Sequence, residues 1–252
     1  GDADFPRGAK RGITRKRDDV GGRGIAQELG VKPGERGVGQ EDQRQFTGRQ
    51  FGRAAGEGGV IDDWRDDAAL GLPIISGNYL VNITSSFGPK KVDGNLLIDL
   101  GNDEILTITG TVWVTGDLTF SCGTNGSLIE LDSAYGANSG VIVVDGVVTV
   151  GNNCTFAGSG ETDSYLMILS AKEQTDRNYP VMIINNNSEG VVYYASKGWV
   201  DFSNGAGAKE VTGYGISMKN NSSVTYEQGL ANLNFTSGPG GAFAIINWEE
   251  TQ

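Results

Sequence analysis

Short segments in which apolar and polar residues alternate recur along the chain after residue 74. Three of them share one pattern: Val, any residue, Gly, any residue, and then two apolar residues separated by one. The clear copies are VDGNLLI (92–98), VTGDLTF (114–120) and VDGVVTV (144–150), and the weaker copies are SKGWVDF (196–202) and VTGYGIS (211–217). Alternation with a period of two is typical of β-strands, and a recurring motif is typical of a repeat architecture. We therefore expect one domain of strands and turns over residues 74–250.

The spacing of the copies indicates how the strands are connected. The aligned glycines Gly94, Gly116 and Gly146 lie 22 and 30 residues apart, which suits one turn of a solenoid with two or three short parallel strands. Apolar side chains of successive turns then stack in columns about 4.8 Å apart. The expected inward positions are Leu96, Ile98, Leu118, Phe120, Val148 and Val150. Asn- and Gly-rich segments between the strands supply the positive φ angles that sharp corners need.

An antiparallel β-sandwich is the alternative fold. It requires two-residue hairpin turns, for which Asn-Gly and Asp-Gly are favoured sequences. Such pairs occur at Asp93-Gly94, Asn125-Gly126, Asp145-Gly146 and Asn204-Gly205. Because the first and third lie inside the repeated motif rather than between two copies, the parallel solenoid is the preferred prediction.

One short segment has a helical period. Ile61, Trp64 and Ala68 have the spacing of one helix face within IDDWRDDAAL (61–70), and Gly and Pro follow it. We expect a short helix and linker over residues 61–73.

Residues 1–60 have neither pattern. They hold 12 Lys and Arg against 9 Asp and Glu, a net charge of +3, whereas the rest of the chain holds 8 against 22, a net charge of -14. Without a sustained apolar face this stretch cannot bury enough surface to offset its conformational entropy. It therefore predicts a disordered Gly/Arg-rich tail, whose deletion we expect to leave the melting temperature nearly unchanged.

Composition excludes several kinds of chemistry. The 252 residues include 40 Gly, 2 Cys and no His, and the net charge is -11. Without His there are no Ser-His or Cys-His nucleophile pairs and no His-ligated zinc, and the two cysteines form no CxxC motif. An acidic chain repels nucleic acid. No run of 18 apolar residues occurs, so no membrane-spanning segment is expected.

Carboxylates are the remaining candidates for chemistry. Those in the first half of the predicted coil are Asp99, Asp103, Glu104, Asp117, Glu130, Asp132 and Asp145. Acids aligned on neighbouring turns can bind Ca²⁺ or act as acid and base in polysaccharide cleavage. Asp93 and Asp145 occupy the same motif position, but Thr115 takes it on the turn between them. We therefore expect solvated outward positions rather than a metal or catalytic site.

Two further clusters have simpler interpretations. Lys90 and Lys91 follow Gly88-Pro89, a turn that predicts exposure rather than the burial a catalytic lysine needs. The Gly-rich stretch 237–241 is not followed by Lys and Ser or Thr, so no phosphate-binding loop is expected.

The cysteines and aromatic residues leave alternatives open. Cys122 and Cys154 lie six residues after Gly116 and eight after Gly146. They are neighbours if the two intervening corners differ by two residues, which would allow a disulfide. Two unpaired buried thiols are the interpretation that we favour. A carbohydrate-stacking face is conceivable from Trp113, Tyr135, Tyr193, Tyr194 and Trp199, but strand alternation places Tyr193 and Tyr194 on opposite faces, which favours core or edge packing.

Several segments together resemble a known group. GPKKVDGNLLI (88–98), TGTVWVTGDLTF (109–120), SGVIVVDGVVTV (139–150) and YEQGLANLNFTSGPGGAFAIINWEE (226–250) look like the β-helical extracellular region of bacterial type IV pilus-associated proteins of the minor-pilin type. The most specific parts are the GP-K-basic-x-x-G-N-L entry, the I/V-W-V-x-G-[DN]-L segment and the closing signature, here Ser237 to Gly241 and Trp248 to Glu249. The resemblance implies a non-catalytic, surface-displayed, right-handed parallel β-helix. Members of that group usually carry an N-terminal apolar helix, and residues 1–60 contain none.

The sequence thus predicts an all-β right-handed parallel β-helix (solenoid) with a short N-terminal helix and a disordered N-terminal tail. We expect an extracellular or cell-surface structural or adhesion module, not an enzyme, with no catalytic, cofactor-binding or metal-binding residues and no cofactor. Its expected partners are pilus or envelope proteins or surface glycans, and not nucleic acid or a membrane. The alternative is a carbohydrate-binding or polysaccharide-degrading β-helix protein.

Overall fold

The computed structural model describes residues 59–226 and Phe235. All of them belong to the second of two compact units, Phe51–Gln252. The predicted tail therefore lies almost wholly outside the described residues, and so does the closing signature at 237–241 and 248–249.

The described chain is mostly β-strand with a single α-helix. The elements are the helix α1 (Val60–Leu70), the 3-10 helix η1 (Ser133–Tyr135) and the strands β1 (Ile75–Ser76), β2 (Tyr79–Val81), β3 (Ser85–Phe87), β4 (Lys90–Asp93), β5 (Leu96–Leu100), β6 (Ile105–Ile108), β7 (Val112–Val114), β8 (Leu118–Cys122), β9 (Leu128–Leu131), β10 (Gly140–Val144), β11 (Val148–Val150), β12 (Thr155–Ala157), β13 (Leu166–Ser170), β14 (Met182–Ile184), β15 (Val192–Phe202), β16 (Gly207–Ala208), β17 (Glu210–Met218) and β18 (Ser223–Val224).

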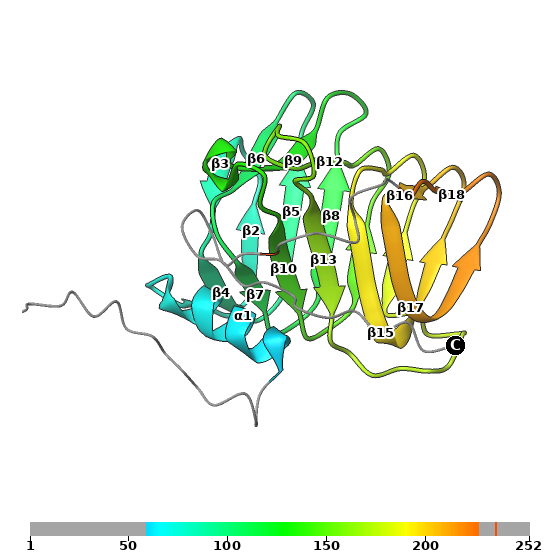
Figure 1. Ribbon diagram of the computed structural model, residues 1–252, viewed down its shortest axis with the longest axis horizontal. Coiled ribbons are helices and arrows are strands. Elements are labelled where there is room, and N and C mark those ends of the chain that lie inside the picture. The colour runs from blue at the N-terminus through cyan, green and yellow to red at the C-terminus, as the bar shows by residue number, and fades with distance from the viewer. Residues whose placement is uncertain (1–58, 227–234, 236–252) are drawn as a thin grey trace, which may run out of the picture. The chain divides into compact units, whose positions relative to one another are not determined.

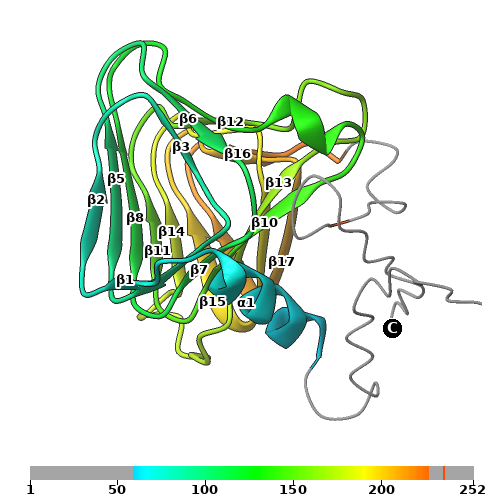
Figure 2. The ribbon, with the colours of Figure 1, turned by 90° about the vertical axis from the view of Figure 1, so that its left-hand side faces the viewer.

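Each strand from β1 to β11 pairs with the strand three positions later, and every ladder between the described strands is parallel (Figures 1 and 2). The first face consists of β1, β4, β7, β10 and β13, the second of β2, β5, β8, β11 and β14, and the third of β3, β6, β9 and β12. We call one passage of the chain through the faces a rung. Parallel pairing confirms that the domain is built of parallel strands, and the antiparallel sandwich is wrong.

The first and second faces are joined through one long strand, β15, near the C-terminal end of the described strands. The long strand β15 pairs with β13 through its first half and with β14 through its second half. A register shift between Ala195 and Trp199, at the β15–β17 ladder, marks the corner. The two faces thereby form one 12-stranded sheet that also includes β17.

The predicted columns of the repeat are confirmed residue by residue. Leu96, Leu118 and Val148 align across β5, β8 and β11. Ile98, Phe120 and Val150 form the next column, and all six side chains are buried. The weaker copy at 196–202 also has the expected register, through Met182 and Ile184 of β14.

The copy at 211–217 is out of register by one residue. Ile216, rather than Gly215, aligns with Val200. Gly215 instead lies against the indole of Trp199, where a Cβ would be 2.5 Å from a ring carbon. The glycine at this position therefore allows a close contact between rungs, whereas the motif assigned an apolar side chain to it.

The repeated Gly followed by Asn or Asp has a physical explanation. The side-chain oxygens of Asn78, Asn95 and Asp117 each accept a hydrogen bond from a backbone N–H of the following rung, at 2.7–3.0 Å. A Cβ on Gly116 would lie 2.8 Å from the backbone of Gly94. The missing side chain lets successive corners approach, and the next residue ties them together.

The helix α1 confirms the helix predicted for 61–70 and contacts β4, β7 and β10 on the outside of the coil (Figure 2). Beneath it lies a second apolar core that contains Trp64, Val141, Val143, Tyr165, Met167, Leu169, Val192 and Phe235. As a result β10 and β13 are buried on both faces. No pattern in the sequence indicated this second core.

Candidate functional site

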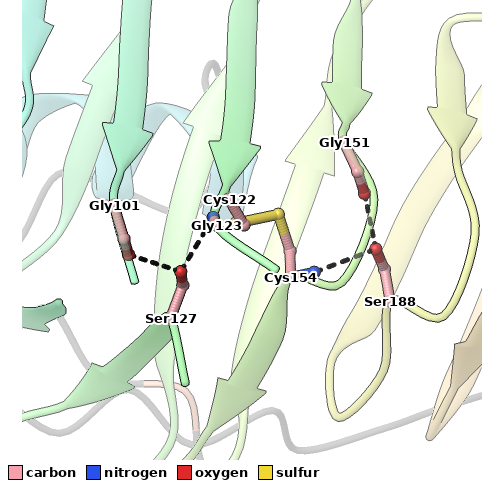
Figure 3. The surroundings of a disulfide bond; sticks show 7 residues. All are labelled: Gly101, Cys122, Gly123, Ser127, Gly151, Cys154 and Ser188. Carbon is pink, nitrogen blue, oxygen red and sulfur yellow. Dashed lines mark hydrogen bonds between the residues drawn. A yellow bond between two sulfur atoms is a disulfide. The ribbon is translucent and has the colours of Figure 1, made fainter. Parts of the chain in front are cut away.

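Cys122 and Cys154 form a disulfide between neighbouring rungs (Figure 3). Cys122 ends β8, and Cys154 follows the corner after the paired strand β11. Phe120 and Val150 are register partners on the two strands. Cys122 lies two residues after Phe120, whereas Cys154 lies four residues after Val150. The corners thus differ by the two residues that pairing requires, and the favoured interpretation of two unpaired thiols is wrong.

Two buried serines continue this connection on either side of the disulfide (Figure 3). The hydroxyl of Ser127 donates to the carbonyl of Gly101 on the preceding rung at 2.7 Å. The hydroxyl of Ser188 likewise donates to the carbonyl of Gly151 at 2.6 Å. The Ser127 hydroxyl, the disulfide and the Ser188 hydroxyl therefore link the four successive rungs that contain β5, β8, β11 and β14. Sequence reasoning missed both serines, although each directly follows an Asn-containing turn.

Asparagines form a ladder at corners of the same kind. Asn153, Asn187, Asn204 and Asn220 all have positive φ angles. The amide of Asn187 donates to the side-chain oxygen of Asn153 at 3.3 Å, and that of Asn220 to Asn204 at 2.7 Å. The predicted role of Asn in the corners is confirmed.

The candidate acids do not converge on one site. Asp99, Asp103 and Asp117 are exposed, as expected. The others are half-buried, and three of them have structural partners: Glu104 accepts from the N–H of Gly101, Asp132 accepts from the N–H of Ala134 at the start of η1, and Asp145 binds Arg65. Among the described residues no group of three or more His, Cys, Asp or Glu lies close enough to hold a metal ion.

Asp145 anchors the helix to the coil. The guanidinium of Arg65 contacts its carboxylate at 2.5 Å and that of Asp62 at 2.8 Å. The indole N–H of Trp113 donates to the second oxygen of Asp145 at 2.8 Å. Burial lowers the pKa of Arg65, but its hydrogen bonds to the two carboxylates outweigh this and leave the pKa above its ordinary value. This cluster holds an element in place and has no free reactive group.

The lysines after Gly88-Pro89 also have structural contacts. The ammonium of Lys90 donates to the carbonyl of Leu72 at 3.1 Å. The ammonium of Lys91 lies 4.1 Å from the ring centre of Trp113, a cation–π distance. Both lysines are half-buried rather than fully exposed.

The candidate aromatic residues do not form one stacking face. Tyr135 and Tyr193 are buried in the main core, and burial raises the pKa of both phenols. Tyr194 packs against the second core, so the predicted opposite orientations of Tyr193 and Tyr194 are confirmed. Core or edge packing was therefore the right interpretation.

A shallow cavity of about 360 Å³ remains beside Trp199, between the loop at 177–180 and strands β15 and β17. The guanidinium of Arg177 lies 5.7 Å from the ring centre of Trp199, and the indole N–H donates to the carbonyl of Thr175 at 2.8 Å. Asp201 and Lys219 form an ion pair of 2.7 Å in the same cavity. The cavity therefore presents an aromatic ring, two cations and one carboxylate to solvent.

Comparisons with protein-family models, curated proteins and solved structures give no match to this chain. The described part of the chain has no helix with the length and hydropathy that crossing a bilayer requires. Any assignment of function therefore depends on the chemistry of the described residues.

Proposed function

We propose that this chain is a non-catalytic structural or adhesion module that works on the outside of a cell, on a pilus or envelope surface. The observation that carries the proposal is the disulfide between Cys122 and Cys154. Disulfides of this structural kind persist in oxidising compartments and are rare in the cytosol. A covalent tie between rungs suits a module that has to stay folded after export.

A right-handed parallel β-helix is the architecture that we propose for the coil. Connections between parallel strands of one sheet are right-handed in about 98% of cases, because strand twist favours that hand. The n to n+3 pairing of the strands supports this architecture. The pilus or envelope setting is supported by the resemblance of residues 88–98, 109–120 and 139–150 to pilus-associated proteins.

The oxidation state of the cysteines tests the proposed compartment. Protein taken from its native cells should be alkylated under denaturing, non-reducing conditions and mapped by mass spectrometry. We expect a Cys122–Cys154 cross-linked peptide and no alkylated cysteine. Recovery of both peptides alkylated would place the protein in a reducing compartment and contradict the proposal.

The stability of the coil tests whether the bond is structural. The double variant Cys122→Ala/Cys154→Ala should lose about 3–4 kcal/mol of unfolding free energy, because the bond closes a long loop with a separation of 32 residues. Urea denaturation measures the loss. Reduction of the unchanged chain is the matched control and should produce a similar loss. A change below about 1 kcal/mol would mean that the bond contributes little to the fold.

Carbohydrate binding at the Trp199 cavity is the second candidate. Arg177 has no ion-pair partner among the described residues, so its guanidinium is available to an acidic sugar. Calorimetric titration with oligosaccharides of uronic acids tests this, with Arg177→Ala as the variant and the exposed Lys197→Ala as the control. We expect only Arg177→Ala to weaken binding, and no heat change with the unchanged chain would reject this candidate.

Polysaccharide cleavage has less support. It needs two carboxylates that face each other across a groove, whereas Asp117, Asp132 and Asp145 are engaged with backbone N–H groups or with Arg65.

A further inference from the structure

The last rung of the described coil has inward side chains that no later described rung covers. Ile216 is 41% exposed although its register partner Val200 is fully buried. Met218, at 46%, shows the same contrast with Phe202. These side chains point into the column of the main core, so one further rung would bury them.

The first rung, at the opposite end, also has an inward side chain that is partly exposed. Tyr79 is 40% exposed, whereas its partner Leu96 on the next rung is 1% exposed. The exposed Ile74 and Ile83 belong to the same part of the chain. Each end of the coil therefore exposes apolar surface together with the unpaired edge of its outermost described strands, a combination that favours pairing with another chain.

The turns at the two ends contain similar numbers of residues. Along the second face, the register step is 17 residues from Val81 to Ile98 at the first end and 16 residues from Phe202 to Met218 at the last. The step from Phe120 to Val150 in the middle is 30 residues. The turns at the two ends are therefore closer in length to each other than to the turn in the middle.

Strand direction determines which ends fit. In a parallel coil each rung is related to the next by translation, so the outer edge of the last rung presents the N–H and C=O pattern that the first rung of an identical coil can continue. Two last rungs brought together would run antiparallel and would lose that continuity.

Both ends have few of the charges that usually protect strand edges. Residues 71–89 contain no Asp, Glu, Lys or Arg, and residues 210–226, from the start of β17, contain only Glu210 and Lys219. Charged residues make up 20% of the whole chain. Natural β-proteins place charges and especially lysines on free edges to prevent edge-to-edge association, so their scarcity at both ends favours association.

The chain after Tyr226 does not supply the missing rung at Phe235. That residue forms a parallel bridge to Ser139, beside β10, and an edge-on ring contact with Trp64 at 6.2 Å. It therefore lies in the second core, on the outside of the coil, and not over the inward side chains of β17.

We propose that copies of this chain stack head to tail, with β17 and β18 of one copy against β1, β2 and β3 of the next. The contact is heterologous, because different surfaces meet, and it leaves a free end on each copy, so it generates open filaments rather than closed dimers. The proposal concerns assembly and holds whether or not the module works at a cell surface.

Two end variants of the full chain test the stacking. Ile216→Lys places a charge at the last rung and Tyr79→Lys places one at the first. Leu97→Lys is the matched control, since Leu97 is 38% exposed but its strand β5 is paired on both sides, with β2 and with β8. Sedimentation velocity over a range of concentrations should show the unchanged chain and Leu97→Lys growing into longer assemblies. Each end variant alone should associate at least tenfold more weakly.

Mixing the two end variants provides the decisive measurement. Each retains one intact end, so the mixture should form dimers and nothing longer. The idea fails if the unchanged chain stays monomeric at all concentrations, if Leu97→Lys weakens association as much as the end variants, or if the mixture forms no dimer. It also fails if only one end variant has an effect, since that result indicates association of two like ends. Equal melting temperatures of the three variants serve as the folding check.

Discussion

At the scale of single residues, the corners of the coil explain the sequence motif. Gly94 and Gly116 are required because a side chain would collide with the backbone of the neighbouring rung. Asn95 and Asp117 then accept the N–H of the next rung. Gly94, which forms a hairpin-type Asp-Gly pair with Asp93 in the sequence, thus lies at a corner where the next residue ties two parallel rungs together.

Leu118 tests the inward register. It is fully buried between Leu96 and Val148, so Leu118→Ala should cost about 2–5 kcal/mol of unfolding free energy by opening a cavity. The neighbouring Thr119→Ala, which points outward, is the control and should cost far less. Chemical denaturation measures both, and a cost for Leu118→Ala below about 1 kcal/mol would contradict the register.

Glu210 gives a pH dependence. Burial raises the pKa of this carboxyl above its ordinary value of 4.5, so the folded chain holds the proton to higher pH than the unfolded chain. The contribution of Glu210 to the stability of the folded state is therefore fully present below pH 4.5 and is lost as the pH rises through the folded pKa. Glu210→Gln should raise the melting temperature at neutral pH and leave it unchanged below pH 4.5, while the exposed Glu161→Gln should change neither. Equal effects at both pH values would show that Glu210 does not titrate in this way.

At the scale of elements, the helix α1 closes a second core on the outside of the coil. Trp64 is 4% exposed and contacts Phe235, whereas Arg65 ties the helix to Asp145. The helix has too few residues to be stable alone in water. Its stability therefore comes from this packing.

Trp64 is the residue on which the helix contact depends most. Trp64→Ala should cost about 3–5 kcal/mol, because it removes a large buried ring. Leu70→Ala is the control, since Leu70 belongs to the same helix and is 73% exposed. Thermal unfolding with circular dichroism measures both, and similar melting temperatures for the two variants would mean that the helix is not docked.

At the scale of the whole described coil, each rung contacts only its neighbours. Strand β8 lies between β5 and β11, whereas β17 pairs with β15 alone among the described strands. Stability in such arrays is a sum of nearest-neighbour terms, so the terminal rungs open most easily.

Hydrogen exchange should reveal this gradient. Backbone amides of β8 and β11 should exchange at least tenfold more slowly than those of β17 at low protein concentration, as measured by mass spectrometry of peptides. Equal protection of the amides in β8, β11 and β17 would contradict the expected gradient. At high concentration the protection of β17 should rise if copies stack head to tail.

The sequence by itself determined the strands, the inward columns and the helix at 61–70. These follow from local patterns, because the alternation of apolar residues fixes which side of a strand is buried, whatever its partner. The recurring Gly also fixed the alignment of Val92, Val114 and Val144. The weaker copy at 211–217 was misaligned by one residue, since Gly215 pairs with Trp199 and Ile216 with Val200.

Tertiary structure alone decided how the rungs are joined and covered. The Cys122–Cys154 bond depends on the different lengths of two corners, and the sequence left that pairing open. The second core depends on α1 and Phe235 meeting on β10, although they are far apart in the chain. Local patterns encode the apolar side of each strand, but which distant segment covers a face is decided only when the chain closes on itself, because that choice depends on how turns of unequal length add up in space.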